Sequence, residues 1–273
     1  MASEGLQGHR ARKRFGQNFL HDRHWIERIA KAVNATEGDD IVEIGPGQAA
    51  LTRELIAGAG KVRAVEIDRD LAAWLKETFP ESLSLIEADA LTLDWTQVAK
   101  NDNLRVVGNL PYNISSPLLF KLLEAADHVK DQHFMLQKEV VDRMVAQHGS
   151  KTYGRLSVML QWRYRMQKLF DVPPGAFNPP PKVMSSVVRM IPKAKEEVPS
   201  VDFELFSSVV ANAFSQRRKT IRNALSALLS AEEIAACDVD PGARAEALPL
   251  DAFVRLAQKA EALGRKAVTP GTT

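Results

Sequence analysis

The chain has 273 residues, enough to bury the core of one large domain and a smaller one. Its 36 Lys and Arg residues nearly balance 34 Asp and Glu residues, so any nucleic-acid surface has to come from clustered charges rather than from net charge. The single cysteine, Cys237, excludes an intramolecular disulfide and a multi-cysteine zinc site, and it fits a reducing compartment.

The N-terminal part is basic and lacks the apolar core of a signal peptide. Its cluster contains Arg10, Arg12, Lys13 and Arg14. We expect residues 1–21 to form a basic arm ahead of the first domain. No later stretch is long and apolar enough to span a bilayer, so we expect a soluble, cytoplasmic protein.

Residues 22–33 have apolar side chains at helical spacing and predict an amphipathic helix. After it, strand-like and helix-like segments alternate. The predicted strands are 40–44, 61–67, 83–88, 104–108 and 131–136, and the predicted helices between them are 49–58, 70–79 and 117–126. Strands separated by helices of this length are typical of βαβ units, so we predict an α/β domain over residues 22–191 with a parallel sheet covered on both faces.

The C-terminal third has a different pattern. Residues 153–170 predict a helix and a strand, and residues 185–190 predict a last strand after the run Pro179-Pro180-Pro181. Residues 192–200 have the composition of a linker. The segments 201–229, 231–237 and 250–263 predict helices, which together form a small all-helical domain over residues 201–264. Residues 265–273 form a tail, for which disorder is expected from Val268 onward.

A glycine-rich turn follows the strand 40–44. Gly45 and Gly47 allow the backbone to approach a ligand closely at the start of a helix. The spacing Gly45-x-Gly47-x-x-Ala50 also fits the dinucleotide fingerprint, so an NAD-dependent oxidoreductase is an alternative. Glu66 ends the next strand, where its carboxylate can accept hydrogen bonds from both hydroxyls of a ribose. This feature serves either cofactor.

Two further acidic residues favour S-adenosylmethionine over NAD. Glu43 lies two residues before Gly45, where it can hold the turn or the ammonium group of a ligand. Asp89 ends the strand 83–88 and can accept from the amino group of an adenine. The ends of parallel strands meet at one edge of the sheet, so Glu43, Glu66 and Asp89 predict a nucleotide-type cofactor site there.

The stretch Gly108–Ser116 contains a turn suited to methylation of an exocyclic amine such as adenine N6. The lone pair of that amine is delocalised, so hydrogen-bond acceptors must hold its two protons. The side-chain oxygen of Asn109 and the carbonyl of Leu110, in the turn that Pro111 stiffens, can be these acceptors, and Tyr112 can stack on the base. A strand running into an ordinary Asn-Pro turn would explain the residues Val106–Asn109 taken alone. The cofactor motif upstream favours the catalytic interpretation.

Four motifs in order resemble the small-subunit ribosomal RNA adenine dimethyltransferases. They are Lys13–Leu20, Val42–Thr52, Asn109–Ser115 and Phe177–Val183. The resemblance extends over nearly the whole chain. It implies a Rossmann-like, S-adenosylmethionine-dependent methyltransferase domain with a small C-terminal helical domain, which agrees with the pattern of predicted elements.

The resemblance also implies particular site residues. Its cofactor contacts correspond to Asn18, Leu20, Gly45, Glu66, Asp89 and Asn109. Asn18 and Leu20 are expected to cover the methionine part, although the residues alone would suggest a helix cap before Asp22. Phe177 is expected to sandwich the target base with Tyr112. The alternative for Phe177 is a loop aromatic that packs under the proline run.

The implied reaction is direct transfer of two methyl groups to N6 of each of two adjacent adenines. The resemblance places these adenines in a hairpin loop near the 3′ end of 16S rRNA, within the small ribosomal subunit during its biogenesis. A target adenine must leave its stack because its amine is unreachable in a helix. The expected protein is a monomer that needs no metal. His21 and His24 have a spacing compatible with metal binding, but no further ligands are nearby in the sequence.

RNA affinity is expected from a second basic cluster, formed by Arg217, Arg218, Lys219 and Arg222. Arg218 and Arg222 are four apart on the predicted helix 201–229, so they share a face along which a phosphate backbone could lie. Two further alternatives stay open. One is a non-catalytic RNA-binding assembly factor with the methyltransferase fold, and the other is methylation of large-subunit RNA or DNA by the same pocket.

Overall fold

The computed structural model describes residues 6, 17–99 and 101–270. The chain divides into two compact units: a larger one of Met1–Val141 with Arg165–Pro192, and a smaller one of Asp142–Tyr164 with Lys193–Thr273. The N-terminal cluster of Arg10, Arg12, Lys13 and Arg14 lies outside the described residues.

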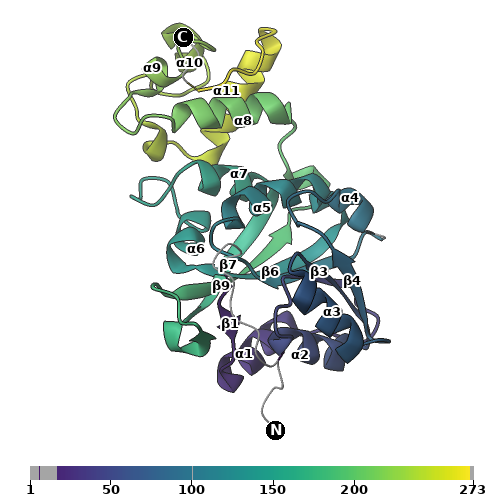
Figure 1. Ribbon diagram of the computed structural model, residues 1–273. Coiled ribbons are helices and arrows are strands. Elements are labelled where there is room, and N and C mark those ends of the chain that lie inside the picture. Colours follow the sequence, from purple (N-terminus) through teal and green to yellow (C-terminus); the bar gives the residue numbers. More distant parts are fainter. Residues whose placement is uncertain (1–5, 7–16, 100, 271–273) are drawn as a thin grey trace. The chain divides into compact units, whose positions relative to one another are not determined.

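The larger unit is built on a seven-stranded sheet with the strand order β4-β3-β2-β5-β6-β9-β7 (Figure 1). The strands are β2 (Ile41–Ile44), β3 (Val62–Glu66), β4 (Leu83–Glu87), β5 (Leu104–Asn109), β6 (Val129–Gln137), β7 (Tyr164–Val172) and β9 (Ser185–Pro192). The first five strands of that order are parallel, as predicted, and β9 is antiparallel to β6. The predicted α/β class is therefore confirmed, with a mixed sheet.

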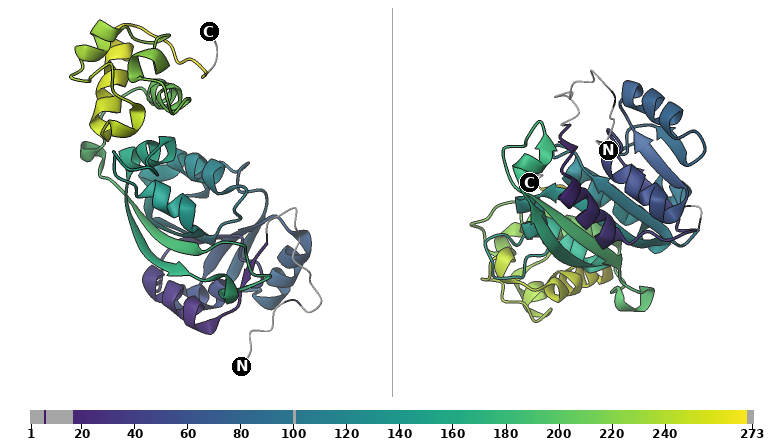
Figure 2. Two further views of the ribbon diagram at one scale, coloured as in Figure 1. Left: turned by 90° about the vertical axis from the view of Figure 1, so that its left-hand side faces the viewer. Right: turned by 90° about the horizontal axis from the view of Figure 1, so that it is seen from below.

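Helices cover both faces of this sheet (Figures 1 and 2). The first face carries α1 (Arg23–Val33), α2 (Ala50–Ala59) and α3 (Arg69–Thr78), and the second carries α4 (Trp95–Val98) and α5 (Ser115–Leu122). Helix α1 begins where the Asp22 side chain accepts from the His24 N–H, and it ends at Asn34 in the left-handed conformation. Its buried residues Ile26, Ile29 and Val33 lie on one side and join the core, as the apolar spacing predicts.

A buried arginine fixes the end of α1 to the sheet. Arg105 on β5 binds the Asp131 carboxylate through two nitrogens at 3.0 Å, and it also binds Asp39 at 2.6 Å. Its guanidinium donates to the carbonyls of Val33 and Asn34 as well. These bonds satisfy a charge that is almost fully enclosed, at the end of the sheet opposite the carboxyl ends of the strands.

A short antiparallel ribbon joins distant parts of the chain. Strand β1 (Phe19–Leu20) pairs with β8 (Phe177–Asn178), with Leu20 opposite Phe177. The N–H groups of His21 and Asp22 both donate to the carbonyl of Ala176. The sequence pattern predicted neither strand, because a two-residue strand has no periodicity of its own.

The prediction of one continuous helix over residues 201–229 in the smaller unit is wrong. Helix α8 spans Phe203–Ala213 and α9 spans Ile221–Ala224, with irregular structure between them. Ser215 donates its hydroxyl to the carbonyl of Asn212, which competes with continuation of the helix. Residues 215–219 are all exposed, so no apolar face extends the helix across this segment.

The smaller unit also includes a segment expected in the first domain. Helix α7 (Arg155–Arg163) packs on α8, with the Trp162 ring 5.6 Å from the Phe206 ring. The Gln161 side chain bonds the carbonyls of Met144 and Ala146 at the start of this segment. The unit therefore begins near residue 142 and resumes at 193, whereas the expected division placed residues 22–191 together, 192–200 as a linker and 201–264 as the helical domain.

The remaining helices of this unit are α10 (Ala231–Ala235) and α11 (Leu250–Ala262), close to their predicted ranges. The disorder expected from Val268 onward is wrong at Val268 itself. Its carbonyl accepts hydrogen bonds from Ser208 and Asn212, two buried polar side chains of α8 that need partners. Packing of the tail against α8 supplies them.

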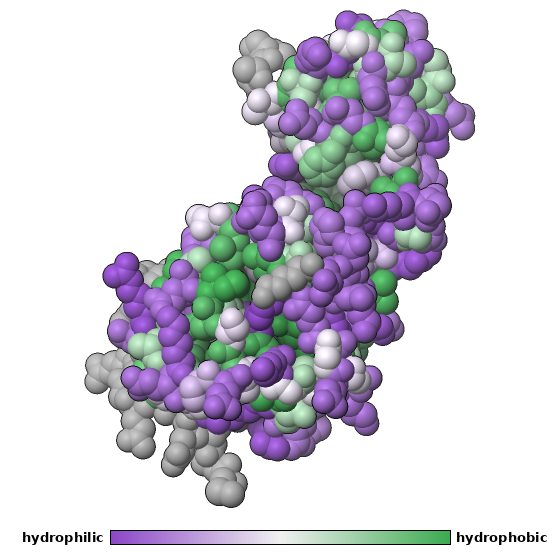
Figure 3. Space-filling view, turned by 90° about the vertical axis from the view of Figure 1, so that its right-hand side faces the viewer, coloured by the Kyte–Doolittle hydropathy of each residue, from purple (hydrophilic) through white to green (hydrophobic). Residues whose placement is uncertain are grey.

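On the face shown in Figure 3, hydrophilic residues cover much of each unit, and hydrophobic residues are visible among them. Among the described residues, no helix is both long and apolar enough to cross a membrane.

Candidate active site

A cavity of about 310 Å³ opens in the larger unit at the carboxyl ends of its parallel strands. The chain runs from β2 to β3 on one side and later to β5 on the other, so this edge is a switch point where open α/β sheets bind ligands. The cavity brings together eight of the residues expected at a site: Asn18, Leu20, Gly45, Glu66, Asp89, Asn109, Leu110 and Tyr112.

The glycine-rich turn after β2 forms one side of the cavity. Gly45 and Gly47 have φ angles of +67° and +56°, a conformation that other residues rarely adopt. A Cβ atom on Gly47 would lie 3.1 Å from the Phe19 ring, whereas one on Gly45 would meet nothing within 4 Å. The turn therefore needs glycine at Gly47 for the close approach of Phe19, and it leaves open space beside Gly45.

Glu66 closes the turn from the end of β3. Its carboxylate accepts from the N–H of Gly47 at 3.3 Å and from the N–H of Asp68 at 2.9 Å. Burial raises the pKa of Glu66, and these N–H groups oppose that effect. The carboxylate retains lone pairs toward the cavity that it lines, so it can accept further hydrogen bonds there.

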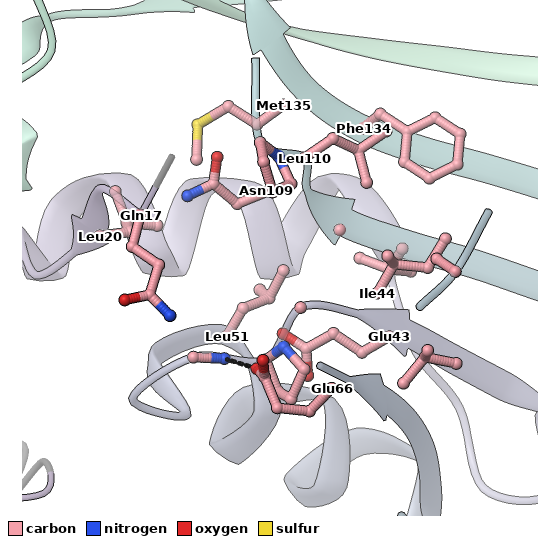
Figure 4. A pocket seen from close by; sticks show the side chains of 18 of the residues that line it. Gln17, Leu20, Glu43, Ile44, Leu51, Glu66, Asn109, Leu110, Phe134 and Met135 are labelled. Carbon is pink, nitrogen blue, oxygen red and sulfur yellow. Dashed lines mark hydrogen bonds between the residues drawn. The ribbon is translucent and has the colours of Figure 1, made fainter. Parts of the chain in front are cut away.

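Glu43 lies beside Glu66 on the neighbouring strand, as Figure 4 shows. Its side chain is 2% exposed, and its Oε2 atom has no hydrogen-bond partner among the described residues. Burial raises the pKa of Glu43 to about 7; Thr52 opposes the shift and the Glu66 carboxylate adds to it. A buried acceptor without a donor is costly, so this atom suits a cationic ligand group in the cavity.

We predict that Glu43→Gln raises the stability of the ligand-free protein at pH 8. The folded state binds the Glu43 proton up to about pH 7, whereas the unfolded chain releases it near its ordinary pKa of 4.5. Stability is therefore lost as the pH rises through this window, by about 3 kcal/mol at most from this group. Denaturant unfolding at pH 5 and pH 8 should show that the free energy of unfolding falls less between these pH values for the variant than for the wild type. Parallel losses would contradict the prediction.

Asn109 ends β5 on the other side of the cavity (Figure 4). Its Nδ2 atom donates to the backbone carbonyl of Asn18 at 3.0 Å. This bond fixes the amide orientation, because only the nitrogen can donate, and it leaves Oδ1 as the free acceptor. The N–H of Leu110 donates to Met135 at 3.1 Å, while no donor among the described residues reaches the Leu110 carbonyl. Two adjacent acceptors are thus available at this turn.

The two expected stacking residues are not equivalent in the structure. Tyr112 is half-buried and lines the cavity. Phe177 is 2% exposed, belongs to the core and does not line the cavity. Its pairing with Leu20 in the β1–β8 ribbon holds it inside. The structure therefore does not bring Phe177 to the position expected for it, and its packing alternative describes the observed place.

Ile67, Phe19 and Gln17 are among the cavity residues that had no individual role in the sequence interpretation. Ile67 is 44% exposed although it directly follows the buried end of β3, and it lines the cavity beside Glu66. Phe19 and Gln17 come from the segment before α1; the Gln17 amide donates to Asp68 at 3.1 Å. An apolar residue directly after the acidic end of β3 was the available signal for Ile67. Gln17 and Phe19 belong to the motif Lys13–Leu20, which was the available signal for their place.

The second basic cluster lies in the smaller unit. Arg217, Arg218, Lys219 and Arg222 are all exposed. Arg217 donates to the carbonyl of Lys151 at 2.8 Å, and the other three form no ion pair within the described part of the chain. The first three belong to the segment between α8 and α9, so the shared helix face expected for Arg218 and Arg222 is wrong.

His21 and His24 are exposed next to the start of α1. Over residues 17–99 and 101–270, no group of three or more His, Cys, Asp and Glu side chains is suited to hold a metal ion. The expectation of a metal-free protein stays a prediction.

Comparisons with known proteins cover almost the whole chain. Residues 8–261 match the family model described as ribosomal RNA adenine dimethylase. The ribosomal RNA small subunit methyltransferase A of Thiobacillus denitrificans is 57% identical over 88% of this chain and 94% of its own length. The proteins of the same name from Acinetobacter baylyi and Pseudomonas aeruginosa are each 53% identical, over 93% and 96% of this chain and 93% and 99% of their own lengths.

Two solved structures are similar over most of their length. A dimethyladenosine transferase from Plasmodium falciparum has a TM-score of 0.80 and 25% identity, covering 92% of this chain and all of that one. The 23S rRNA methyltransferase ErmE has a TM-score of 0.67 and 26% identity, covering 89% of this chain and all of that one.

Proposed function

The chain belongs to the ribosomal RNA adenine dimethylase family, and from this premise we propose that it transfers methyl groups from S-adenosylmethionine to N6 of adenines in small-subunit ribosomal RNA. The family overturns the NAD-dependent oxidoreductase alternative. The relatives named for small-subunit RNA are 53–57% identical, whereas the 23S rRNA enzyme is 26% identical. This difference favours 16S rRNA over the large-subunit alternative.

The cavity has the features that S-adenosylmethionine requires. Glu66 is available for the two ribose hydroxyls, and the exposed side chain of Ile67 beside it suits the face of an adenine ring. Asp89 lines the same cavity and can accept from the amino group of that ring. The unpartnered Oε2 of Glu43 suits the ammonium group. Asn18 and Leu20 line the remaining side and are proposed to cover the methionine part.

Bound S-adenosylmethionine would supply an electrophilic methyl group. The residues of this chain orient the amine that receives it, and that amine then releases one proton to water. Asn109 Oδ1 and the Leu110 carbonyl each accept one N6 proton, which makes the amine geometry more tetrahedral and its lone pair available. The observation that carries the proposal is the 3.0 Å bond from Asn109 Nδ2 to the Asn18 carbonyl, because it leaves Oδ1 as an acceptor at the cavity. No covalent intermediate with the protein is needed.

Tyr112 is proposed to stack on the extruded adenine, as the aromatic residue of this turn that lines the cavity. Stacking of a base on an aromatic ring contributes roughly 1–3 kcal/mol, which offsets much of the unstacking cost. A contact between Phe177 and the adenine would require the Phe177 side chain to leave the core. We therefore assign the stacking role to Tyr112 alone.

The exposed cations Arg217, Arg218, Lys219 and Arg222 are proposed to bind RNA phosphates. We expect Arg218→Ala and Arg222→Ala each to weaken RNA binding and to reduce the slope of log affinity against log salt by about one, because each cation releases about one counterion. Affinity measured at several salt concentrations tests this, with Lys266→Ala, another exposed lysine of the same unit, as the control. An unchanged slope would remove that residue from the RNA surface.

The deciding experiment uses labelled S-adenosylmethionine and small ribosomal subunits that lack the modification. After reaction, the RNA is digested and the labelled nucleoside is identified by mass spectrometry. We expect N6,N6-dimethyladenosine at two adjacent adenines of a hairpin loop near the 3′ end of 16S rRNA. Monomethyladenosine alone would contradict two rounds of transfer. If the protein binds the cofactor but no label appears in subunit RNA, the result would favour the assembly-factor alternative or another nucleic acid as the substrate. We expect a monomeric, cytoplasmic protein.

A further inference from the structure

The hydroxyl of Tyr112 is bonded to a residue outside the cavity. Tyr112 Oη lies 2.7 Å from Ser185 Oγ, and either atom can be the donor. Tyr112 lines the cavity, whereas Ser185 does not. The bond therefore connects a wall of the proposed base slot to a residue behind it.

Ser185 is the first residue of β9 and is fully buried, directly after two exposed apolar residues. Val183 and Met184 are 45% and 37% exposed, whereas Ser185 is 0% exposed. Within the described part of the chain, the Tyr112 hydroxyl is the one hydrogen-bond partner of Ser185 Oγ. Burying a hydroxyl costs free energy even when it has a partner, so packing alone would favour an apolar residue at this position.

The sheet holds Ser185 in a fixed place. Ser185 pairs with Gln137 at the end of β6, and the neighbouring N–H of Lys138 donates to the Met184 carbonyl at 2.9 Å. Asn109 pairs with Met135 on the other side of β6. Because β6 lies between β5 and β9, the bond from Tyr112 to Ser185 spans its carboxyl end. The turn that carries Tyr112 is thereby anchored to a rigid strand.

We propose that Ser185 is a positioning residue that holds the Tyr112 ring as a fixed wall of the slot for the target adenine. Ser185 does not touch the substrate and acts through the phenol of Tyr112. A fixed wall matters most for the second transfer, because the monomethylated amine has one proton fewer for the acceptors and a larger volume. This inference rests on the stacking role of Tyr112 proposed above.

The test is a cycle of Ser185→Ala, Tyr112→Phe and the double variant, each assayed in steady-state turnover on small subunits. We expect each single variant to lower kcat roughly 3- to 10-fold, the effect of one hydrogen bond. The share of monomethyladenosine should rise, and the KM for RNA should change less than kcat. The double variant should be no slower than Tyr112→Phe alone, because both changes remove the same bond.

Ser186→Ala is the matched control. Ser186 is also fully buried on β9, but its hydroxyl bonds Asp171 at 2.6 Å, on the other side of the strand. Ser186→Ala should therefore show the merely structural effect of losing a buried serine hydroxyl. Its midpoint of thermal unfolding should fall, while the ratio of monomethyladenosine to dimethyladenosine should not change. If Ser185→Ala does not fold, Tyr112→Phe removes the same bond from its half-buried partner.

Two outcomes would overturn the inference: wild-type kcat and product ratio in Ser185→Ala, or single effects that multiply in the double variant. The variant Tyr112→Ala distinguishes a wrong role for Ser185 from a wrong proposed function. If Tyr112→Ala abolishes transfer while Ser185→Ala does not affect it, only the role of Ser185 is wrong. If Tyr112→Ala itself transfers normally, the stacking role is wrong.

Discussion

Replacing Asn109 by alanine is expected to lower the rate of methyl transfer about 100- to 1000-fold, the effect of losing one placed hydrogen-bonding group in an active site. The Oδ1 acceptor disappears, so one N6 proton loses its partner and the lone pair returns to the ring. The Asn18 carbonyl also loses the bond that Asn109 donates at 3.0 Å. The Leu110 carbonyl is the remaining acceptor and accounts for residual transfer.

This prediction is checked by single-turnover transfer to small subunits, with cofactor and RNA affinities measured in parallel. RNA affinity should change far less than the rate, because Asn109 acts on the reacting amine. Cofactor affinity should fall as well, by less than the rate, because Asn109 is only one of the expected cofactor contacts. Asn103→Ala is a suitable control, since Asn103 is an exposed asparagine just before the opposite end of β5. Near-normal transfer by Asn109→Ala would show that the proposed mechanism is wrong.

Replacing Glu66 by alanine is expected to weaken S-adenosylmethionine binding about 100-fold or more. Two ribose hydroxyls would lose a charged acceptor, and hydrogen bonds to charged groups contribute about 1.5–3 kcal/mol each. The N–H groups of Gly47 and Asp68 would also lose the carboxylate that orders the glycine turn. The loss of affinity thus combines direct contacts with a less ordered turn.

Calorimetry or a thermal-shift titration with S-adenosylmethionine measures this change. The control is Glu77→Ala, which removes an exposed glutamate on α3. At saturating cofactor the Glu66 variant should recover much of its transfer rate, unlike Asn109→Ala. An unchanged affinity would mean that Glu66 supports the turn without binding the ribose.

Much of the site was predictable because its signals are local. Gly45 and Gly47 are needed where φ is positive, Glu66 is the last residue of β3, and Asp89 follows β4 along the chain. Since parallel strands end at one edge, a residue that follows a strand is placed there by strand order alone. These residues, with Asn109, line one cavity as expected.

Two of the errors concern contacts between distant segments, and one concerns a local break in a predicted helix. Phe177 has the composition of a stacking residue, yet its pairing with Leu20 in the β1–β8 ribbon places it in the core. The residues Arg217, Arg218 and Lys219 look helical by spacing, yet they lie between α8 and α9. Residues 142–164 join the smaller unit because Trp162 packs on Phe206.

Residue patterns alone therefore specify the α/β class, the edge of the sheet that holds the site and the residue types that line it. Periodicity and strand order are local properties, and each element carries them in its own residues. Tertiary structure decided which way the Asn109 amide faces, that Phe177 is enclosed, and that Ser185 meets Tyr112. Each of these depends on a partner 70 or more positions away, and only the folded chain brings such partners together.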